Sequence, residues 1–446
     1  MADSDRWRPS VAHVALLLPW IMAVVASRLP MGDNSFLWHI TAGRLQTEQG
    51  SVLTTDPFSF TFSGQPWRTQ AWLADIGFDA LDGWFGLGFV TPLVALSALI
   101  VFGFVLATAY RYSRSVEATA LVGVLTAWLA AIFLNPRPVL FSYALLAVVV
   151  AAAGHHRLRW ILPLVVWVWA SVHGSFVLGL GYIVLDGLRR RDRRAAGEAL
   201  VGTFAATLTA HGIGVWRVLL DFAGSRESLS MITEWRTPNI TGVELVPFLI
   251  GIVLLLVGAI KGRLRMADLW IIVPFLAFGL AATRSVFPAW IPLAPLVAVA
   301  VSGLPRATRS RTALPAPLVV AALLVVSIPV VVPLEGGLSD RFPVEAAGAL
   351  EADHVFHDDV VGGYLIYRFA GARQVFVDDR AELYDGEFFR DVIATRAGTP
   401  TWREVFDERD IEQALLRVDD GLVEALESEG WQRVYADDSF VVLDEP

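Results

Sequence analysis

The hydrophobic positions of the chain fall into long apolar runs that are separated by short gaps carrying arginine. A helix that spans a bilayer needs roughly 20 predominantly apolar residues, and runs of this kind follow one another between Val11 and Leu334. Eleven can be drawn, at residues 11–30, 88–110, 118–134, 139–154, 161–172, 175–188, 197–211, 244–260, 267–282, 285–303 and 316–333. The pattern predicts a polytopic α-helical membrane protein with about 11 spans.

Two of these runs are too short to cross a membrane alone. Residues 161–172 and 175–188 are joined through Val172-His173-Gly174-Ser175 and could form one long tilted helix. A single span would move the arginine cluster that follows to the other side of the membrane, so we expect two short helices. Broken helices are tolerated where they line a buried cavity. The first run could be a cleaved signal peptide, but its flank is neutral and many spans follow, so we expect it to remain.

Composition agrees with a membrane protein. Hydrophobic residues make up 55% of the 446 positions, charged residues make up 18%, and the mean hydropathy is +0.55. These values do not fit a soluble domain, so we expect the lipid bilayer as a partner and no nucleic acid. The chain contains no cysteine, which excludes disulfides, thiolate catalysis and cysteine-ligated metal sites.

Charge divides the chain into two parts. Residues 1–333 carry 25 Lys and Arg against 17 Asp and Glu, a net charge of +8, whereas residues 334–446 carry 10 against 27, a net charge of −17. We expect a transmembrane domain over residues 1–333. The acidic remainder is long enough for a small α/β domain.

Positive charge also alternates between successive gaps. One set of gaps holds 17 Lys and Arg, and the opposite set holds 8 although its loops are longer. Because cytoplasmic loops carry the excess of Lys and Arg, the amino terminus is predicted to be cytoplasmic. The long loop 31–87 and the acidic tail are then extracytoplasmic.

The loop 31–87 is predicted to be structured. It is rich in aromatic residues, which disordered segments lack: Trp38, Phe58, Phe60, Phe62, Trp67, Trp72, Phe78, Trp84 and Phe85. Apolar positions recur at helical spacing over 35–48 and 70–85, so we expect two amphipathic helices lying at the membrane interface.

Asp33 is the candidate catalytic residue of this loop. It follows the first predicted span, where a partly desolvated carboxylate can act as a general base. The alternative is that Asp33 caps the helix beginning near Asn34 or Ser35. Trp38 and His39 are candidates for substrate binding; His39 could also join Asp33 at a divalent cation, although a packed interfacial histidine is the simpler interpretation. Asp56 precedes Pro57 and is expected to organise a turn.

The other predicted outer loops place polar side chains at the membrane boundary. These are Arg137, His173, His211, Glu234 and Arg284. Arginine can grip a phosphate or pyrophosphate through paired hydrogen bonds, and polar groups at such depth are functional candidates. A single arginine is also explained by its side chain reaching toward the interface, so the convergence of several on one side favours a site.

The tail is predicted to mix helices and strands. Helices are expected at Phe342–Glu351, Asp410–Leu416 and Leu422–Glu429, helix or strand at Gly363–Phe369 and Gln374–Val377, and a hairpin over Val434–Leu443. Asp378, Asp379 and Arg380 follow an apolar run and would lie at the carboxyl end of a strand, where α/β sheets bind ligands. A solvated acidic surface with a structural Asp–Arg pair is the alternative.

Several segments together resemble a bacterial family of polytopic proteins related to the C-type (GT-C) glycosyltransferases. They are Asp33 with Trp38-His39 and Thr41-Ala42-Gly43, Thr54-Thr55-Asp56-Pro57-Phe58-Ser59, Gly64-Gln65-Pro66-Trp67, Trp72-Leu73, Val172-His173-Gly174-Ser175, Gly362-Gly363-Tyr364-Leu365 and Val377-Asp378-Asp379-Arg380-Ala381-Glu382-Leu383-Tyr384. The resemblance covers most of the chain and implies an enzyme of the bacterial cytoplasmic membrane.

The resemblance also implies a mechanism. An acidic residue at the position of Asp33 would deprotonate an acceptor hydroxyl, which attacks the anomeric carbon of a polyprenyl-phosphate-linked sugar with inversion. Arg137, Arg284 and His173 would stabilise the departing lipid phosphate. A nucleotide-binding glycine fingerprint is not needed for such a donor, and none is found. No cofactor is expected beyond a possible divalent cation.

The chain departs from the family pattern at two places. The family often has a second acidic residue where this chain has Ser35, and His-Glu where this chain has Gln70-Ala71. The first departure argues against a bound metal. Together they leave two alternatives open, a transporter or flippase of a lipid-linked saccharide and a non-catalytic scaffold whose acidic domain recruits a partner.

Overall fold

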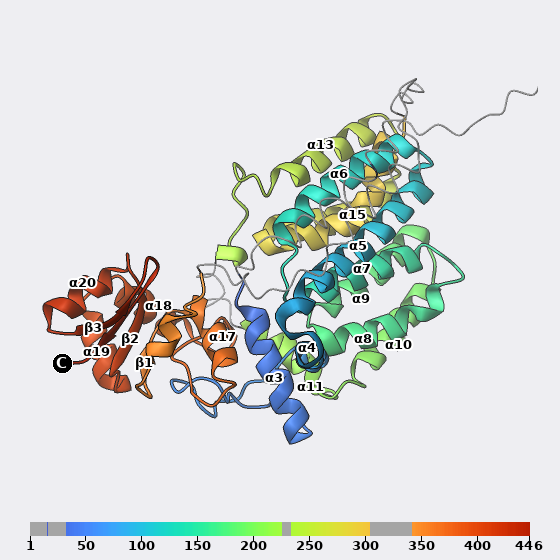
Figure 1. Cartoon of the computed structure of the whole chain (residues 1–446). Coiled ribbons are helices and arrows are strands. Elements are labelled where there is room, and N and C mark those ends of the chain that lie inside the picture. The colour runs from blue at the N-terminus through green and yellow to red at the C-terminus, as the bar shows by residue number, and fades with distance from the viewer. Residues whose placement is uncertain (1–15, 17–32, 225–232, 304–340) are drawn as a thin grey trace, which may run out of the picture. The chain divides into compact units, whose positions relative to one another are not determined.

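The computed structural model describes residue 16 and residues 33–224, 233–303 and 341–446 (Figure 1). The first and last predicted runs, 11–30 and 316–333, lie outside the described residues. Each of the other nine runs coincides with a helix: α5 (Val90–Ser113), α6 (Val116–Phe133), α7 (Val139–Ala153), α8 (Leu162–Val172), α9 (Phe176–Arg190), α10 (Arg194–Ala206), α13 (Val246–Ile260), α14 (Leu269–Ala281) and α15 (Val286–Val301).

Three helical stretches are long and apolar enough to cross a membrane, by length and composition. They are Trp72–Ser113, Val116–Phe133 and Thr283–Val301. Shorter apolar helices occur at Val139–Ala153, Arg159–Val172, Val246–Ile260 and Met266–Ala281. The described residues therefore form a mostly helical fold of membrane character, with three candidate spans where the sequence predicted about 11.

The two short runs around residue 173 are separate helices, as expected. His173 ends α8 in an extended conformation, with φ −170° and ψ 142°, and α9 begins at Phe176. A single tilted helix over this region is therefore wrong.

The chain divides into two compact units. Within the described residues, the first unit comprises 88–212 and 233–303, and the second comprises 33–87, 213–224 and 341–446. The sequence interpretation grouped the loop 31–87 with the transmembrane domain, whereas the structure folds this loop together with the acidic tail.

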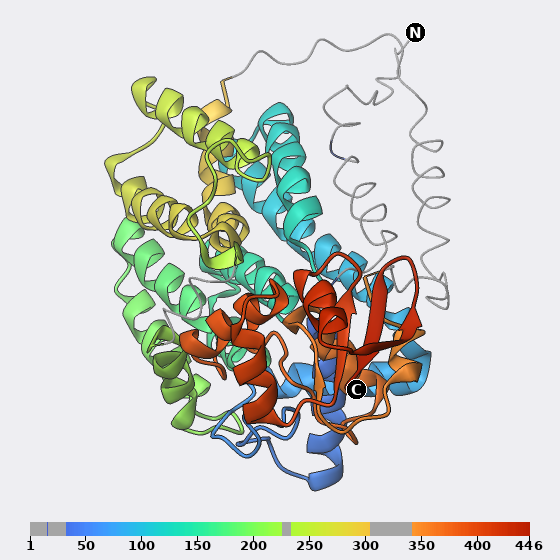
Figure 2. The ribbon, with the colours of Figure 1, turned by 90° about the vertical axis from the view of Figure 1, so that its left-hand side faces the viewer.

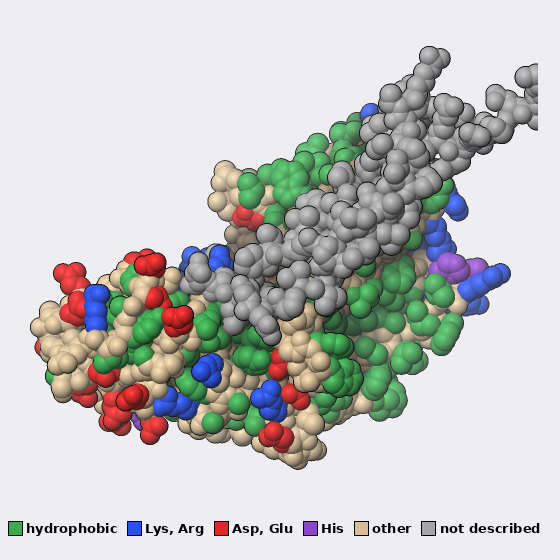
Figure 3. Space-filling view, viewed as in Figure 1, with side chains coloured by type: hydrophobic (Ala, Val, Ile, Leu, Met, Phe, Trp, Pro, Cys, Tyr) green, Lys and Arg blue, Asp and Glu red, His purple; other side chains and the backbone are tan. Residues whose placement is uncertain are grey.

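Helix α15 lies at the core of the first unit. Nearly all of its residues are buried, and Trp290 donates a 2.8 Å hydrogen bond to the Thr126 hydroxyl of α6. Gly251 of α13 lies against the Trp290 ring, where a Cβ would come within 2.5 Å of it. Large apolar side chains are exposed on the outer helices, among them Leu200, Phe204, Leu256 and Val273, and Figure 3 shows such side chains in green on the visible face of this unit. Exposed apolar surface of this kind suits a lipid environment.

Ion pairs link the ends of neighbouring helices of the first unit. These pairs lie in the gaps that the sequence assigns to the cytoplasm. Arg189 of α9 lies 2.8 Å from Asp268, in η4 (Met266–Asp268), and 3.0 Å from Asp186. Arg159 lies 2.6 Å from Glu198 of α10. Part of the arginine excess in these gaps therefore has a packing role, because an arginine buried there without its carboxylate would be strongly destabilising.

The tail forms a four-stranded sheet with helices. Its elements are α17 (Asp359–Arg368), α18 (Gly386–Arg396), α19 (Thr401–Arg409), α20 (Gly421–Ser428), β1 (Val355–Phe356), β2 (Gln413–Arg417), β3 (Gln432–Ala436) and β4 (Phe440–Asp444). The strands lie in the order β1-β2-β4-β3. Figure 2 shows the strands near the end of the chain in red. β1 pairs with β2 in parallel, and β4 is antiparallel to β2 and β3, with Ala414 opposite Leu443.

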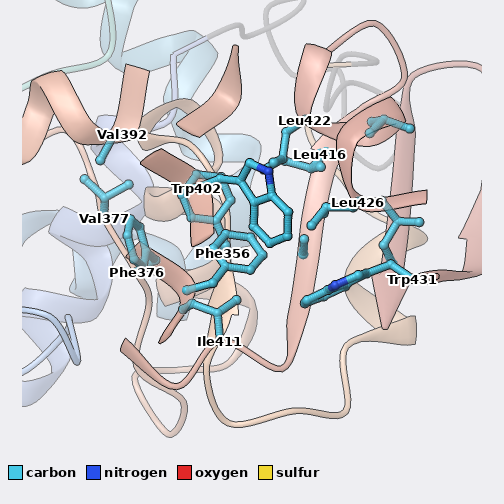
Figure 4. Packing of buried hydrophobic residues seen from close by; sticks show 14 of the residues in the cluster. Phe356, Phe376, Val377, Val392, Trp402, Ile411, Leu416, Leu422, Leu426 and Trp431 are labelled. Carbon is cyan, nitrogen blue, oxygen red and sulfur yellow. The ribbon is translucent and has the colours of Figure 1, made fainter. Parts of the chain in front are cut away.

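An apolar cluster joins the sheet to the helices of the tail. Phe356, Leu416 and Leu443 come from the strands, and Trp402 and Leu426 from α19 and α20. Figure 4 shows the Trp402 ring among these side chains. The small α/β domain predicted from the composition of the tail therefore has its own core.

Local predictions in the tail are confirmed in part. The terminal hairpin and the helix near Leu422 are found, and Gly363 lies in a helix, α17. The helix predicted at Phe342–Glu351 is wrong, because only the short 3₁₀ helix η8 (Ala346–Ala349) forms there. The helix predicted at Asp410–Leu416 is also wrong. Residues 413–416 are all buried between β1 and β4, and a short run buried on both faces is typical of an inner strand.

The two helices predicted in the loop 31–87 are α3 (Ser35–Gln49) and α4 (Trp72–Phe85). The interfacial position predicted for α3 is wrong, because residues 35–43 are all buried, with α4 and α17 packed against the helix. Figure 1 shows α3 beside α17. Helix α4 ends on two exposed aromatic residues, Trp84 and Phe85, as an interfacial helix would. A third helix, α11 (Gly214–Gly224), also belongs to the second unit.

Candidate functional site

Arg380 is the buried centre of the second unit. Its guanidinium donates to both oxygens of Asp378, at 2.7 and 2.6 Å, and its Nη1 lies 2.7 Å from Asp56 Oδ1. The contact with Asp56 is an ion pair rather than an aligned hydrogen bond. The side chains of Asp56, Asp378 and Arg380 are fully buried.

Aromatic rings and charge complete the surroundings of Arg380. The rings of Trp67, Phe58 and Trp38 lie 4.5, 5.1 and 6.0 Å from its guanidinium carbon. Burial lowers the pKa of Arg380, but Asp378, Tyr384 and Asp56 outweigh burial and raise the pKa well above its usual value. Arg380 is thus a permanently charged link between the loop and the tail.

Asp56 also organises its own turn, as the sequence indicates. Its two carboxylate oxygens accept the amides of Phe58 and Ser59, at 2.9 and 3.1 Å. The residues that follow pair with the tail, since the Phe60 amide donates to the Val375 carbonyl and the Val375 amide to the Phe58 carbonyl. The run at Gln374–Val377 therefore pairs with the loop 31–87, through a bridge between Ser59 and Val375, and is not a strand of the tail sheet.

Two glycines allow the tail to approach α3. A Cβ on Gly363 would come within 2.5 Å of the Asn34 carbonyl oxygen, and a Cβ on Gly362 would meet the Val377 carbonyl. The Asn34 side chain donates to the Asp359 and Val360 carbonyls at the start of α17. The tail segments that carry the family resemblance therefore pack on the loop segments that carry it.

Asp33 and Asp379 meet at Ser35. The Ser35 amide donates a 2.9 Å hydrogen bond to Asp33 Oδ1, the contact that the capping alternative predicts. The Ser35 hydroxyl donates to Asp379 Oδ2, and the Trp38 indole donates to Asp379 Oδ1 at 2.8 Å. Ser35 therefore lies between two carboxylates, one from the loop and one from the tail.

The start of α17 adds two more carboxylates. Asp358 caps this helix by accepting the Val360 amide. The carboxyl of Asp359 is surrounded by protein, although the residue as a whole is half-buried. Burial and the neighbouring Asp358 and Asp379 raise the pKa of Asp359 to about 7. The site is thus strongly acidic and suits neutral, hydroxyl-bearing ligands better than anions.

His39 forms a buried pair with Asp75, a residue that the sequence reading missed. His39 Nδ1 lies 2.6 Å from Asp75 Oδ1, while Asp75 Oδ2 accepts from Thr69 at 2.6 Å and Gln46 at 3.2 Å. The His39 ring stacks on Trp38 with centroids 3.6 Å apart. Asp75 could have been found from its helical spacing, since it shares a buried face of α4 with Ala71, Ala74 and Phe78.

In the first unit, Arg137 and Arg284 come together around one short segment. Arg137 Nη1 lies 3.4 Å from Glu234 Oε2. The guanidinium carbon of Arg284 lies 4.2 Å from the centre of the Trp235 ring. Both arginines and Glu234 lie within electrostatic reach of the buried phenol of Tyr143. Three residues from separate predicted outer loops thus form one cluster, with Tyr143 and Trp235 added by the structure.

His173 lies in a polar network at the break between α8 and α9. Its Nδ1 accepts the Ser175 amide at 3.1 Å, and the Ser175 hydroxyl contacts Ser142 at 2.9 Å. The Trp169 indole donates to Ser142 at 3.0 Å. This network reaches α7 next to Tyr143. His211 lies in the turn that follows α10.

Among the residues that the structure describes, no three His, Cys, Asp or Glu side chains gather closely enough to hold a metal ion. His39 pairs with Asp75, whereas Asp33 contacts Ser35. The arrangement therefore offers carboxylates and a histidine for proton transfer, and arginines for binding an anion.

No protein-family model matches the chain, and no curated protein is similar to it at a significant level.

Proposed function

We propose that the chain is a membrane glycosyltransferase that moves a sugar from a polyprenyl-phosphate-linked donor to an acceptor hydroxyl on the extracytoplasmic side, with Asp33 as the general base. The observation that carries the proposal is that Arg137 and Arg284 contact adjacent residues of one short segment, Glu234 and Trp235. Two arginines at the ends of apolar helices suit the phosphate of a lipid whose chain lies in the bilayer.

The acidic cluster of the second unit supports the acceptor half of the reaction. A carboxylate can accept about four hydrogen bonds, so the bond from the Ser35 amide to Asp33 is compatible with a catalytic role. Asp379 brings a second carboxylate to Ser35. The tail is then a component of the site, which weighs against a tail that serves only to recruit a partner.

The proposed reaction assigns a role to each group. Asp33 takes the proton of the acceptor hydroxyl as its oxygen attacks the anomeric carbon, and the bond to the lipid phosphate breaks with inversion. Arg137 and Arg284 stabilise the negative charge that collects on the leaving phosphate, with His173 as a further donor.

The topology belongs to the same proposal. About 11 spans would cross the bacterial cytoplasmic membrane, with the amino terminus inside and the tail outside. A flippase of a lipid-linked saccharide could use the same arginines without using Asp33 as a base, so turnover separates the two functions.

Donor binding tests the role of the arginines. Arg137→Gln and Arg284→Gln should each weaken the binding of a polyprenyl monophosphate in nanodiscs by about tenfold or more, because a charge-assisted hydrogen bond is lost. Arg157→Gln, in an exposed position of a predicted cytoplasmic gap, is the matched control and should bind as the wild type does. Equal binding by all four proteins would remove the proposed donor site.

A further inference from the structure

The segment 233–236 covers both arginines of the candidate phosphate site. Glu234 lies on Arg137 and Trp235 lies on Arg284. The next residue fixes the segment, because the Arg236 carbonyl accepts the Thr283 amide at 3.0 Å and the Thr283 hydroxyl at 3.2 Å. Thr283 and Arg284 belong to one short helix, η5 (Thr283–Ser285), so the segment is tied to the same element that presents Arg284.

The contact between Glu234 and Arg137 is weak. Its 3.4 Å separation is long for a charge-assisted hydrogen bond, and the two side chains are 43% and 28% exposed. Ion pairs with this exposure contribute little because water competes for both charges. A phosphate has enough oxygens to accept hydrogen bonds from both arginines at once, so it is able to displace Glu234.

The contact between Trp235 and Arg284 has the opposite effect. An arginine stacked on an aromatic ring uses the face of the guanidinium, while its N–H donors point outward in the plane. The ring contact therefore limits the rotation of the Arg284 side chain. A donor that is already oriented loses less entropy when the anion binds.

We propose that Glu234 is an internal anion that occupies Arg137 until the phosphate of the substrate displaces it, and that Trp235 is a positioning residue for Arg284. The inference deepens the proposed function and rests on it for the identity of the anion, a phosphate or pyrophosphate on a lipid carrier. Glu234 then acts on specificity, because an anion that reaches only Arg137 competes poorly with its carboxylate, whereas a phosphate that binds Arg137 and Arg284 together competes well.

Anion binding to the full-length protein in nanodiscs of neutral lipid tests the inference, with inorganic pyrophosphate as the calorimetric probe. Glu234→Gln should bind pyrophosphate about two- to fivefold more tightly than the wild type, since a weak competing ion pair is removed. Glu244→Gln makes the same charge change in the same connection and should have no effect. Trp235→Phe should keep the wild-type affinity, whereas Trp235→Ala should weaken it.

A double variant isolates the contact itself. In an Arg137→Gln background, Glu234→Gln should no longer change the affinity, because the effect acts through Arg137. Unchanged or weaker binding by Glu234→Gln, or no pyrophosphate binding by any variant, would overturn the inference. Tighter binding by Glu234→Gln in a protein that transfers no sugar would keep the inference and remove the proposed transfer. Sugar transfer with unchanged pyrophosphate binding would do the reverse.

Discussion

The indole nitrogen of Trp38 donates a 2.8 Å hydrogen bond to the carboxylate of Asp379, which lies 341 positions further along the chain. The same carboxylate accepts the hydroxyl of Ser35, and the next residue, Arg380, reaches Asp56. The loop after the first predicted span is therefore completed by the end of the chain. Removing the tail would expose α3 and leave Asp56 buried without its partner.

Replacing Arg380 should destabilise the second unit more than replacing an arginine of an exposed ion pair does. Arg380→Met leaves Asp56 and Asp378 buried without a cation, and a charge abandoned in this way costs about 3–5 kcal/mol. Arg403→Met is the control, since Arg403 pairs with Glu429 at the surface, where such pairs contribute at most about 1 kcal/mol. Limited proteolysis of the two variants under increasing denaturant measures the difference. Equal resistance of the two variants to proteolysis would contradict the role of Arg380 as a link between the loop and the tail.

A methyl group at Gly363 should separate α17 from α3. In Gly363→Ala the new Cβ would lie 2.5 Å from the Asn34 carbonyl oxygen, so the backbone must shift, at a cost of roughly 1–3 kcal/mol. Gly77→Ala in α4 is the control, because a Cβ there meets nothing within 4 Å and alanine favours a helix. Thermal unfolding should distinguish the two, and a stable Gly363→Ala protein would contradict the close packing of these helices.

The contribution of Asp359 to the stability of the second unit falls as pH rises from about 4 to about 7. Its pKa is raised from 3.8 to about 7, so between these values the folded state binds more protons than the unfolded state. By linkage, this group favours folding at acid pH and loses that contribution as pH rises through about 7. Asp359→Asn should therefore lose less stability than the wild type between pH about 4 and about 7. An identical pH profile would contradict the raised pKa.

His357 acts in the opposite direction. Burial lowers its pKa below 6.5 and outweighs the Asp358 carbonyl, which contacts Nδ1 at 2.8 Å and raises the pKa. Nε2 accepts the Phe376 amide at 3.0 Å. The unfolded state then binds the extra proton, so this contribution to stability is lost as pH falls below about 6.5. His357→Gln should flatten the acid side of the stability profile, and an unchanged acid limb would contradict the assignment.

The sidedness predicted from the distribution of arginine can be measured directly. A reporter enzyme that is active only outside the cytoplasm, fused after Pro446, should be active, and the same reporter inserted at Gly262 should be silent. Activity at Gly262 and silence at Pro446 would invert the topology.

The sequence predicted the helical part well because its signal is local. An apolar run of sufficient length predicts a helix without reference to the rest of the chain. The polar residues around Gly174 likewise indicated the break at His173. The turn at Asp56 and the cap at Asp33 are local as well. Asp410–Leu416 was misread because a short buried run has the same composition in a strand and in a helix.

The union of the loop and the tail could not be predicted from the sequence. Asp56 and Arg380 lie far apart in the chain, and neither carries a local signal of the other. From the sequence, Asp378 and Arg380 were explained by their own neighbourhood, as a structural pair on an acidic surface. In the structure, Arg380 also pairs with Asp56, a contact that only the tertiary fold creates. Tyr143 and Trp235 were missed for a related reason, since a tyrosine in an apolar helix and a tryptophan in a loop are ordinary until their neighbours are known.

The most direct test of the proposed function is a transfer assay that compares the wild type with Asp33→Asn in nanodiscs. Radiolabelled polyprenyl-phosphate sugars are supplied as donors, and membrane extract supplies the acceptor. The account predicts that the wild type transfers label, and that Asp33→Asn binds the donor but loses transfer by about 100-fold or more, as expected when a general base is removed. Transfer by Asp33→Asn at the wild-type rate would contradict the assignment of Asp33. Donor binding without transfer by either protein, in the presence of an acceptor that a known glycosyltransferase uses, would contradict the proposed function itself.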